Sequence, residues 1–196
     1  MIKNSKTNFI VKVAILGALS GILMMFKFPT PIAPSFYKLE FSDVAALLGG
    51  FALGPTAGLI ICLIKNLINL LIEGTTTAFI GELSNLIMSS SYVVVASMIY
   101  KRIHTKKGAI KSLVCGIISL CFVSCIINYY VVIPAYVKFM NFPLEAIIGM
   151  GTAIVPSINS LLTLVLLCTL PFNLIKGICV SIITYVVYKR VSPLLH

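Results

Sequence analysis

The stretch Ser42–Ile72, SDVAALLGGFALGPTAGLIICLIKNLINLLI, decides how this chain folds. It is almost wholly apolar and too long for one membrane-spanning helix, which needs about 20 residues. Gly54 and Pro55 interrupt it, and proline removes a helix hydrogen bond while glycine loosens the backbone. We therefore predict a chain reversal there, with a short helix over 42–52 and a longer one over 55–72. The short helix reaches only ~16 Å, so it crosses a membrane only with help from its neighbours.

The rest of the chain has the same character. Of its 196 residues, 59% are hydrophobic and 10% are charged, whereas soluble domains carry about 25% charged residues. Further long uncharged runs cover Leu83–Tyr100, Ser112–Val137 and Ala146–Ile175. Runs of this length predict membrane helices. We therefore expect a multi-pass protein of the cell membrane that is solvated by the lipid bilayer, with its first helix retained.

Ten of the fifteen Lys and Arg residues gather in clusters that flank apolar runs. These clusters are Lys3, Lys6 and Lys12; Lys101, Arg102, Lys106, Lys107 and Lys111; and Lys189 and Arg190. Such clusters mark the cytoplasmic ends and loops of membrane proteins. They account for the net charge of +10 without nucleic acid, so we expect no nucleic-acid partner.

Charge placement also fixes the number of crossings. Since the N-terminus and the 101–112 loop are both predicted to be cytoplasmic, an even number of helices separates them. The prediction is one all-α integral membrane domain over 1–196 with both termini cytoplasmic. Its six transmembrane helices lie at about 9–28, 42–52, 55–72, 79–101, 108–136 and 171–190. Pro171 opens the last helix, and 138–170 is then an outer connection.

Five residues converge in the outer third of the predicted membrane. Counting 1.5 Å per residue from the basic clusters places Asn128 ~26 Å, Asn173 ~24 Å and Lys176 ~20 Å from the cytoplasmic side. Glu40 and Phe41 open the short second helix from the outer side. Polar groups at this depth predict either an outward-facing binding pocket or separate hydrogen bonds between helices.

Two further features concern packing. Asp43 and Lys65 lie at similar heights on either side of the predicted reversal, which indicates a buried ion pair with a structural role. Small residues at Ala14 and Ala18, with Gly17 and Gly21 beside them, form a flat helix face. Such a face permits close approach of another helix, either within this chain or in a partner.

No catalytic constellation accompanies these features. The sequence has only five acidic residues, with no carboxylate pair on one helix face and no phosphate-binding loop. Its six cysteines form no Cys-x-x-Cys pair and sit in apolar runs, as small hydrophobic residues do. We expect neither an enzyme nor a metal site, and no cofactor.

Six blocks, in order along nearly the whole chain, resemble the riboflavin-binding S-components of energy-coupling factor (ECF) transporters. They are Lys38–Asp43, Leu53–Gly58, Ile64–Leu67, Gly81–Asn85, Asn128–Tyr130 with Pro134–Tyr136, and Pro171–Gly177. The resemblance implies a six-helix subunit that binds riboflavin near the outer face. It also implies two kinds of partner, a transmembrane coupling subunit and two ATPases that supply the energy.

The resemblance assigns roles to residues by position. Glu40, Asn128, Asn173 and Lys176 match polar riboflavin contacts, and Phe41 matches an apolar wall residue. Ala14 and Ala18 match the small-residue motif by which S-components dock their coupling subunit. The alternatives are an S-component for a different vitamin and a non-transport integral membrane protein.

Overall fold

The computed structural model describes residues 5–195 as a helical bundle with a single small sheet in that range. The long helices before the first basic turn are α1 (Ser5–Met25), α3 (Pro55–Glu73) and α4 (Ile80–Arg102), with the short α2 (Ser42–Leu53) between α1 and α3. A second group follows: α5 (Lys106–Ile127), the π-helical η1 (Asn128–Val132), α6 (Ile133–Phe139), α7 (Leu144–Thr152), α8 (Leu161–Leu164), the π-helical η2 (Val165–Thr169) and α9 (Leu170–Leu195). Strands β1 (Phe28–Pro29) and β2 (Lys38–Leu39) pair antiparallel inside the loop between α1 and α2.

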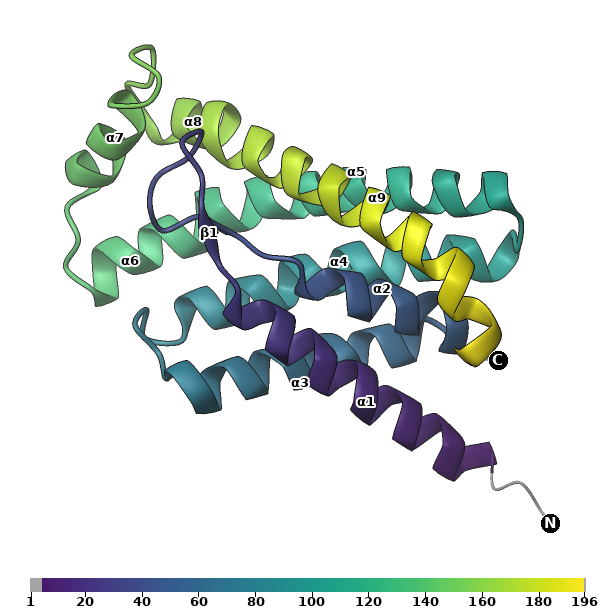
Figure 1. Cartoon of the computed structure of the whole chain (residues 1–196). Coiled ribbons are helices and arrows are strands. Elements are labelled where there is room, and N and C mark those ends of the chain that lie inside the picture. Colours follow the sequence, from purple (N-terminus) through teal and green to yellow (C-terminus); the bar gives the residue numbers. More distant parts are fainter. Residues whose placement is uncertain (1–4, 196) are drawn as a thin grey trace.

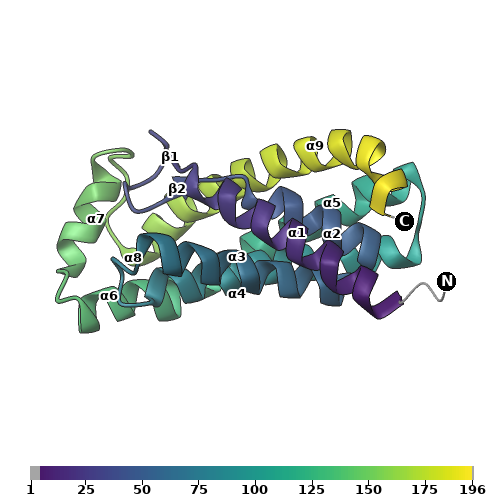
Figure 2. The same ribbon diagram turned by 60° about the horizontal axis from the view of Figure 1, so that its bottom comes forward.

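The long helices run up and down a common axis, which gives the molecule two distinct ends (Figures 1 and 2). We call the end that holds the start of α1, the end of α9 and the α4–α5 turn the basic end, because Lys101, Arg102, Lys106, Lys107, Lys111, Lys189 and Arg190 lie there. The opposite end, formed by the β1–β2 loop, the α3–α4 turn and α7, is called the site end (Figures 1 and 2).

Five helical segments are long and apolar enough to cross a membrane. They cover Lys6–Met25, Pro55–Glu73, Ile80–Arg102, Lys106–Phe139 and Leu161–Arg190. Large apolar side chains on their outer faces are exposed, such as Ile118 and Phe122, which are 63% and 67% exposed. Exposed apolar surface on this scale needs lipid around it. The chain is therefore an all-α, multi-pass membrane protein.

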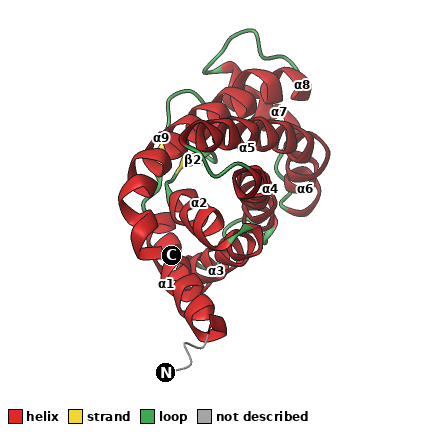
Figure 3. Ribbon diagram, turned by 90° about the vertical axis from the view of Figure 1, so that its right-hand side faces the viewer, coloured by secondary structure: helices red, strands yellow, loops and turns green. Residues whose placement is uncertain are grey.

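The short α2 forms the centre of the bundle. Viewed from the basic end, α2 lies inside a ring of longer helices (Figure 3), and it contacts α1, α3, α4 and α9. Its residues from Ser42 to Phe51 are buried on every side. The predicted reversal is present: Gly54 adopts φ +100°, a conformation that glycine accepts without a side-chain clash, and Pro55 is the first residue of α3.

Helix α1 packs on α3 through its two glycines. A Cβ atom added at Gly17 would lie 2.7 Å from Ile64 Cγ2, and one at Gly21 would lie 2.8 Å from Ile68 Cγ2. Both glycines therefore serve packing within the chain. The side chains of Ala14 and Ala18 belong to the exposed face of the same helix.

Several helix boundaries differ from the sequence prediction: the first helix begins at Ser5 instead of 9, and the helix predicted over 108–136 covers Lys106–Phe139. Helix α1 ends at Met25 instead of 28, because the residue before a proline disfavours helical backbone and Phe28-Pro29 is instead extended in β1. The final long helix begins at Leu161 instead of 171, so the predicted 138–170 connection is wrong over its last ten residues. Its first half contains α7.

The π-helical turns explain why proline does not break the last helix. In η2 the Leu170 N–H donates to the Val165 carbonyl five residues back, which widens the turn directly before Pro171. The helix thereby passes the proline ring without a break. Segment η1 does the same before Pro134, where the Ile133 N–H donates to the Asn128 carbonyl.

Candidate ligand-binding site at the site end

The loop between α1 and α2 folds back onto the bundle instead of extending away from it. The β1–β2 pairing closes its base, and Tyr37 N–H donates to the Pro34 carbonyl at 2.9 Å near its tip. Ala33 and Tyr37 pack with Phe172 of α9 in a small buried cluster. The loop therefore brings Tyr37 and Glu40 into the interior.

Four charged side chains meet at the base of this loop in what we call the charge quartet, Glu40, Asp43, Lys65 and Lys176. Lys176 Nζ lies 2.6 Å from Glu40 Oε1. Lys65 Nζ lies 2.5 Å from Asp43 Oδ1, which confirms the predicted Asp43–Lys65 pair. The pairs are cross-linked, since Lys176 is 3.3 Å from Asp43 Oδ2 and Lys65 is 4.0 Å from Glu40 Oε1.

All four members are buried, and their charges cancel. Buried charges are tolerated when they are paired and also hydrogen-bonded. Serines supply these bonds: Lys65 Nζ donates to Ser42 Oγ at 2.7 Å and to Ser89 Oγ at 3.0 Å. The Ser42 backbone N–H donates to Glu40 Oε2 at 2.7 Å. The quartet thus ties the loop to α2, α3, α4 and α9.

Asn128 lies at the junction of α5 and η1, where its side chain meets the loop. Its Oδ1 accepts a hydrogen bond of 2.9 Å from the Tyr37 hydroxyl, and its Nδ2 donates to the Ser124 carbonyl at 2.8 Å. The same hydroxyl lies 2.7 Å from Thr169 Oγ1 at the end of η2. Burial raises the pKa of the Tyr37 phenol, so it is neutral and retains its proton for donation.

The two other predicted site residues are Asn173, which contacts Thr169 of this group, and Phe41. Asn173 Nδ2 donates to the Thr169 carbonyl, at 2.9 Å, on its own helix. Phe41 immediately precedes α2 and is half-buried, with its ring centre 6.2 Å from that of Phe28.

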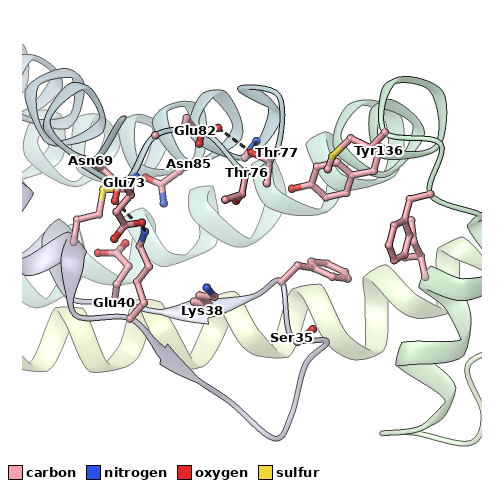
Figure 4. A pocket seen from close by; sticks show the side chains of 18 of the residues that line it. Ser35, Lys38, Glu40, Asn69, Glu73, Thr76, Thr77, Glu82, Asn85 and Tyr136 are labelled. Atoms are coloured by element: carbon pink, nitrogen blue, oxygen red, sulfur yellow. Dashed lines mark hydrogen bonds and ion pairs between the residues drawn. The ribbon is translucent and has the colours of Figure 1, made fainter. Parts of the chain in front are cut away.

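A cavity of about 540 Å³ opens beside the loop (Figure 4). One part of its wall is apolar or aromatic and comes mainly from the loop and from α6, α7 and the segment between them: Phe36, Tyr136, Met140, Phe142, Ile147 and Met150. The other part is polar and comes from the loop, from α3 and α4 and from the turn between them: Lys27, Ser35, Lys38, Glu40, Asn69, Glu73, Thr76, Thr77, Glu82 and Asn85. The cavity therefore offers an apolar region and a hydrogen-bonding region to the same ligand.

The polar wall is held in place by its own contacts. Lys27 Nζ donates to Asn69 Oδ1 at 2.9 Å and pairs with the Glu73 carboxylate. Thr77 Oγ1 donates to Glu82 at 2.9 Å (Figure 4). These contacts join the ends of α1, α3 and α4 around the cavity mouth.

The structure brings the predicted residues together in part. Glu40 lines the cavity and contacts Lys176 directly. Asn128 and Asn173 are linked through Tyr37 and Thr169, and they lie behind the loop, on the side of η1 and α9.

Comparisons with known proteins identify the family. The model of the family "ECF transporter, substrate-specific component" matches residues 8–188. The chain belongs to this family. The family is one of transport components and not of enzymes, which agrees with the prediction from sequence.

Named relatives and a solved structure resemble this S-component over nearly its whole length. It is 33% identical to the riboflavin transporter RibU of Staphylococcus aureus (strain TCH60), covering 95% of this chain and 91% of the relative. It is 29% identical to the riboflavin transporter FmnP of Bacillus subtilis (strain 168), covering 96% and 94%. A solved structure described as "Structure and mechanism of the S component of a bacterial ECF transporter" superposes with a TM-score of 0.76 at 32% identity, covering 97% of this chain and 99% of the other.

Reasoning from sequence missed several residues at the site of this S-component. Glu82 and Asn85 lie three apart on α4 and share a helix face, the same signal that singled out Asn173 and Lys176. Tyr37 lies in a loop without periodicity, so no pattern in the sequence points to it.

Proposed function

We propose that this S-component binds riboflavin at its site end and delivers it to an ATP-driven coupling module. The observation that carries the proposal is the cavity of about 540 Å³ with one aromatic and one polar region, bounded by Glu40. Buried amides of Asn128 and Asn173 and the ammonium of Lys176 lie directly behind the loop. The names of the relatives, riboflavin transporters, support the same ligand.

The chemistry of riboflavin suits this arrangement. Its isoalloxazine ring is flat and aromatic and packs well against aromatic walls such as Phe36 and Tyr136. The imide edge of the ring has one donor and two acceptors, which the side-chain amides of Asn128 and Asn173 complement. Its ribityl hydroxyls are suited to charged partners such as Glu40 and Lys176, and Phe41 adds apolar surface nearby.

We further propose six crossings with both termini in the cytoplasm, so that 1–196 forms one membrane domain. The charge distribution supports this orientation. All five acidic residues lie in the charge quartet or on the segments of the site end, as Glu73, Glu82 and Glu145 do. The basic end is therefore strongly positive, as cytoplasmic ends are. Helix α2 then acts as the sixth crossing, shielded from lipid by its neighbours.

The energy must come from partners, which we propose to be a transmembrane coupling subunit and two ATPases. The exposed face of α1 is a suitable docking surface, because Ala14 and Ala18 leave room for a second helix. The glycines of the same motif are used within the chain, against Ile64 and Ile68 of α3. This division supports docking through the alanines.

The function is tested by titrating detergent-purified protein into riboflavin and following flavin fluorescence. We expect quenching with a nanomolar dissociation constant, about −12 kcal/mol. Thiamine and biotin, vitamins without an isoalloxazine ring, serve as competitors that should leave the signal unchanged. Absence of quenching at micromolar protein would refute riboflavin as the ligand.

A further inference from the structure

We propose that Tyr37 is a built-in competitor of the ligand, whose hydroxyl occupies the hydrogen-bonding positions of the site until the ligand displaces it. The inference rests on the proposed function and deepens it, because it concerns access to the same site. It assigns a role to a side chain that no pattern in the sequence singles out.

The geometry of one hydroxyl group carries the proposal. Tyr37 is 9% exposed, and its oxygen lies 2.9 Å from Asn128 Oδ1 and 2.7 Å from Thr169 Oγ1. These two partners lie on η1 and η2, which are more than 30 residues apart in the sequence and contact each other in the structure. The ring fills the space beside them, with its centre 5.2 Å from that of Phe172 and 4.6 Å from that of Phe36.

A ligand that uses Asn128 must displace the side chains that cover it, because Asn128 is 2% exposed and is not among the residues that line the cavity. Tyr37 is one of these side chains: its hydroxyl donates to Asn128 Oδ1, while Asn128 Nδ2 donates to the Ser124 carbonyl. Tyr37 belongs to the same loop as Phe36 and Glu40, which line the cavity, so a shift of this loop changes the cavity and the cover of Asn128 together. Binding at Asn128 and closure by Tyr37 exclude each other.

Competition of this kind lowers the apparent affinity for the ligand by the fraction of molecules in which the loop is open. Removing the hydroxyl leaves the buried Asn128 Oδ1 and Thr169 Oγ1 without this partner in the closed state, which destabilises that state relative to the open one. The substitution Tyr37→Phe keeps the ring and its packing. We expect it to bind riboflavin about tenfold more tightly, mainly through faster association.

The experiment compares stopped-flow and equilibrium riboflavin titrations of wild type, Tyr37→Phe, Thr169→Val and the double variant. Tyr130→Phe is the matched control, because Tyr130 is 71% exposed on the same η1 segment. Thr169→Val removes the other partner of the same hydroxyl and should also tighten binding. The double variant should then gain less than the sum of the single effects, since the Tyr37–Thr169 contact is lost in each.

A second measurement reports on the loop without any ligand. Hydrogen–deuterium exchange of the amides in residues 33–41 should be faster in Tyr37→Phe than in wild type or in Tyr130→Phe. The proposal is overturned if exchange in this segment is unchanged in Tyr37→Phe, or if the variant binds riboflavin with unchanged or weaker affinity. Weaker affinity would mean that the Tyr37 hydroxyl contacts the ligand instead of competing with it. Failure of the proposed function is distinguishable, because wild type itself would then fail to quench riboflavin.

Discussion

The charge quartet gives the sharpest test of how this bundle is stabilised. Asp43→Asn leaves one carboxylate, Glu40, for the two ammonium groups of Lys65 and Lys176, and the quartet then carries a net charge of +1. Lys65→Met leaves two carboxylates with only Lys176 and a net charge of −1. The double variant restores neutrality, because the Glu40–Lys176 pair at 2.6 Å remains.

The magnitude follows from the distances. Breaking a buried pair costs about 3–5 kcal/mol of folding free energy, because an uncompensated charge stays in the interior. The cross contacts reduce this cost. In Asp43→Asn, Lys65 remains 4.0 Å from Glu40. At an effective dielectric constant of ~20 the Coulomb attraction over this distance is about 4 kcal/mol, without the cost of desolvating the two charges. We therefore expect each single variant near the lower end, about 3 kcal/mol, and the double variant to be more stable than either single variant.

Thermal stability measures this cycle. At about 2–4 °C per kcal/mol, a loss of about 3 kcal/mol lowers the midpoint by roughly 6–12 °C. The midpoint is taken as the temperature at which half of the protein leaves the monodisperse size-exclusion peak. Lys27→Met is the matched control, since its partner Glu73 is 38% exposed and partly exposed ion pairs contribute about 0–1 kcal/mol. Additive effects of Asp43→Asn and Lys65→Met would refute the reasoning, because they would mean that the two charges do not stabilise each other.

Three other outcomes follow from the proposed site and docking face. Asn128→Ala and Asn173→Ala should each weaken riboflavin binding about tenfold or more, since an unpaired buried ligand group costs about 1–3 kcal/mol. Fluorescence titration of the purified variants measures this affinity. Ala14→Trp combined with Ala18→Trp should retain riboflavin binding but lose uptake and co-purification with the coupling subunit, because bulky side chains hold the two helices apart. FMN should bind more weakly than riboflavin in competition titrations, since a phosphate loses its hydration in a cavity that already holds carboxylates.

Controls separate these outcomes from misfolding. Both asparagine variants must elute as wild type does, and wild-type affinity in both would assign the amides to helix packing instead. Ile118→Trp with Phe122→Trp places two tryptophans at the same four-residue spacing on an exposed face of α5, where we expect normal uptake. Normal uptake by the Ala14→Trp, Ala18→Trp variant would mean that the coupling subunit docks on another surface. FMN affinity equal to that of riboflavin would mean that the phosphate of bound FMN lies in open solvent.

Features set by local chemistry were predictable from the sequence. Gly54 and Pro55 divide the longest apolar block because of their backbone restrictions, and the reversal then forces Asp43 and Lys65 to the same height. Spacing of three residues predicts that Asn173 and Lys176 share a face of one helix, and both residues are buried on α9.

Features set by packing between distant segments were not predictable. The extension of the quartet to Glu40 and Lys176 depends on how an irregular loop returns to α9. Pro171 was read as a helix start because proline breaks an ordinary α-helix, whereas the π-helical turn η2 accommodates it. The apolar cavity wall from α7 is likewise contributed by a connection whose helix gave no clear boundary in the sequence.

The charges of the chain divide the molecule into regions with separate roles. The quartet sums to zero, and the remaining charges of the site end also balance, with Lys27, Lys38 and Lys138 against Glu73, Glu82 and Glu145. Of the ten basic residues that remain, nine lie at the basic end, and the tenth, Lys3, lies outside the described residues. A neutral site end exerts little long-range attraction on ions, so selection of a ligand there depends on shape and hydrogen bonds. An uncharged vitamin with an aromatic body and a polyol chain meets these conditions and leaves the buried quartet neutral. A charged ligand would need an opposite charge in the protein, whereas the four charges of the quartet already pair with one another.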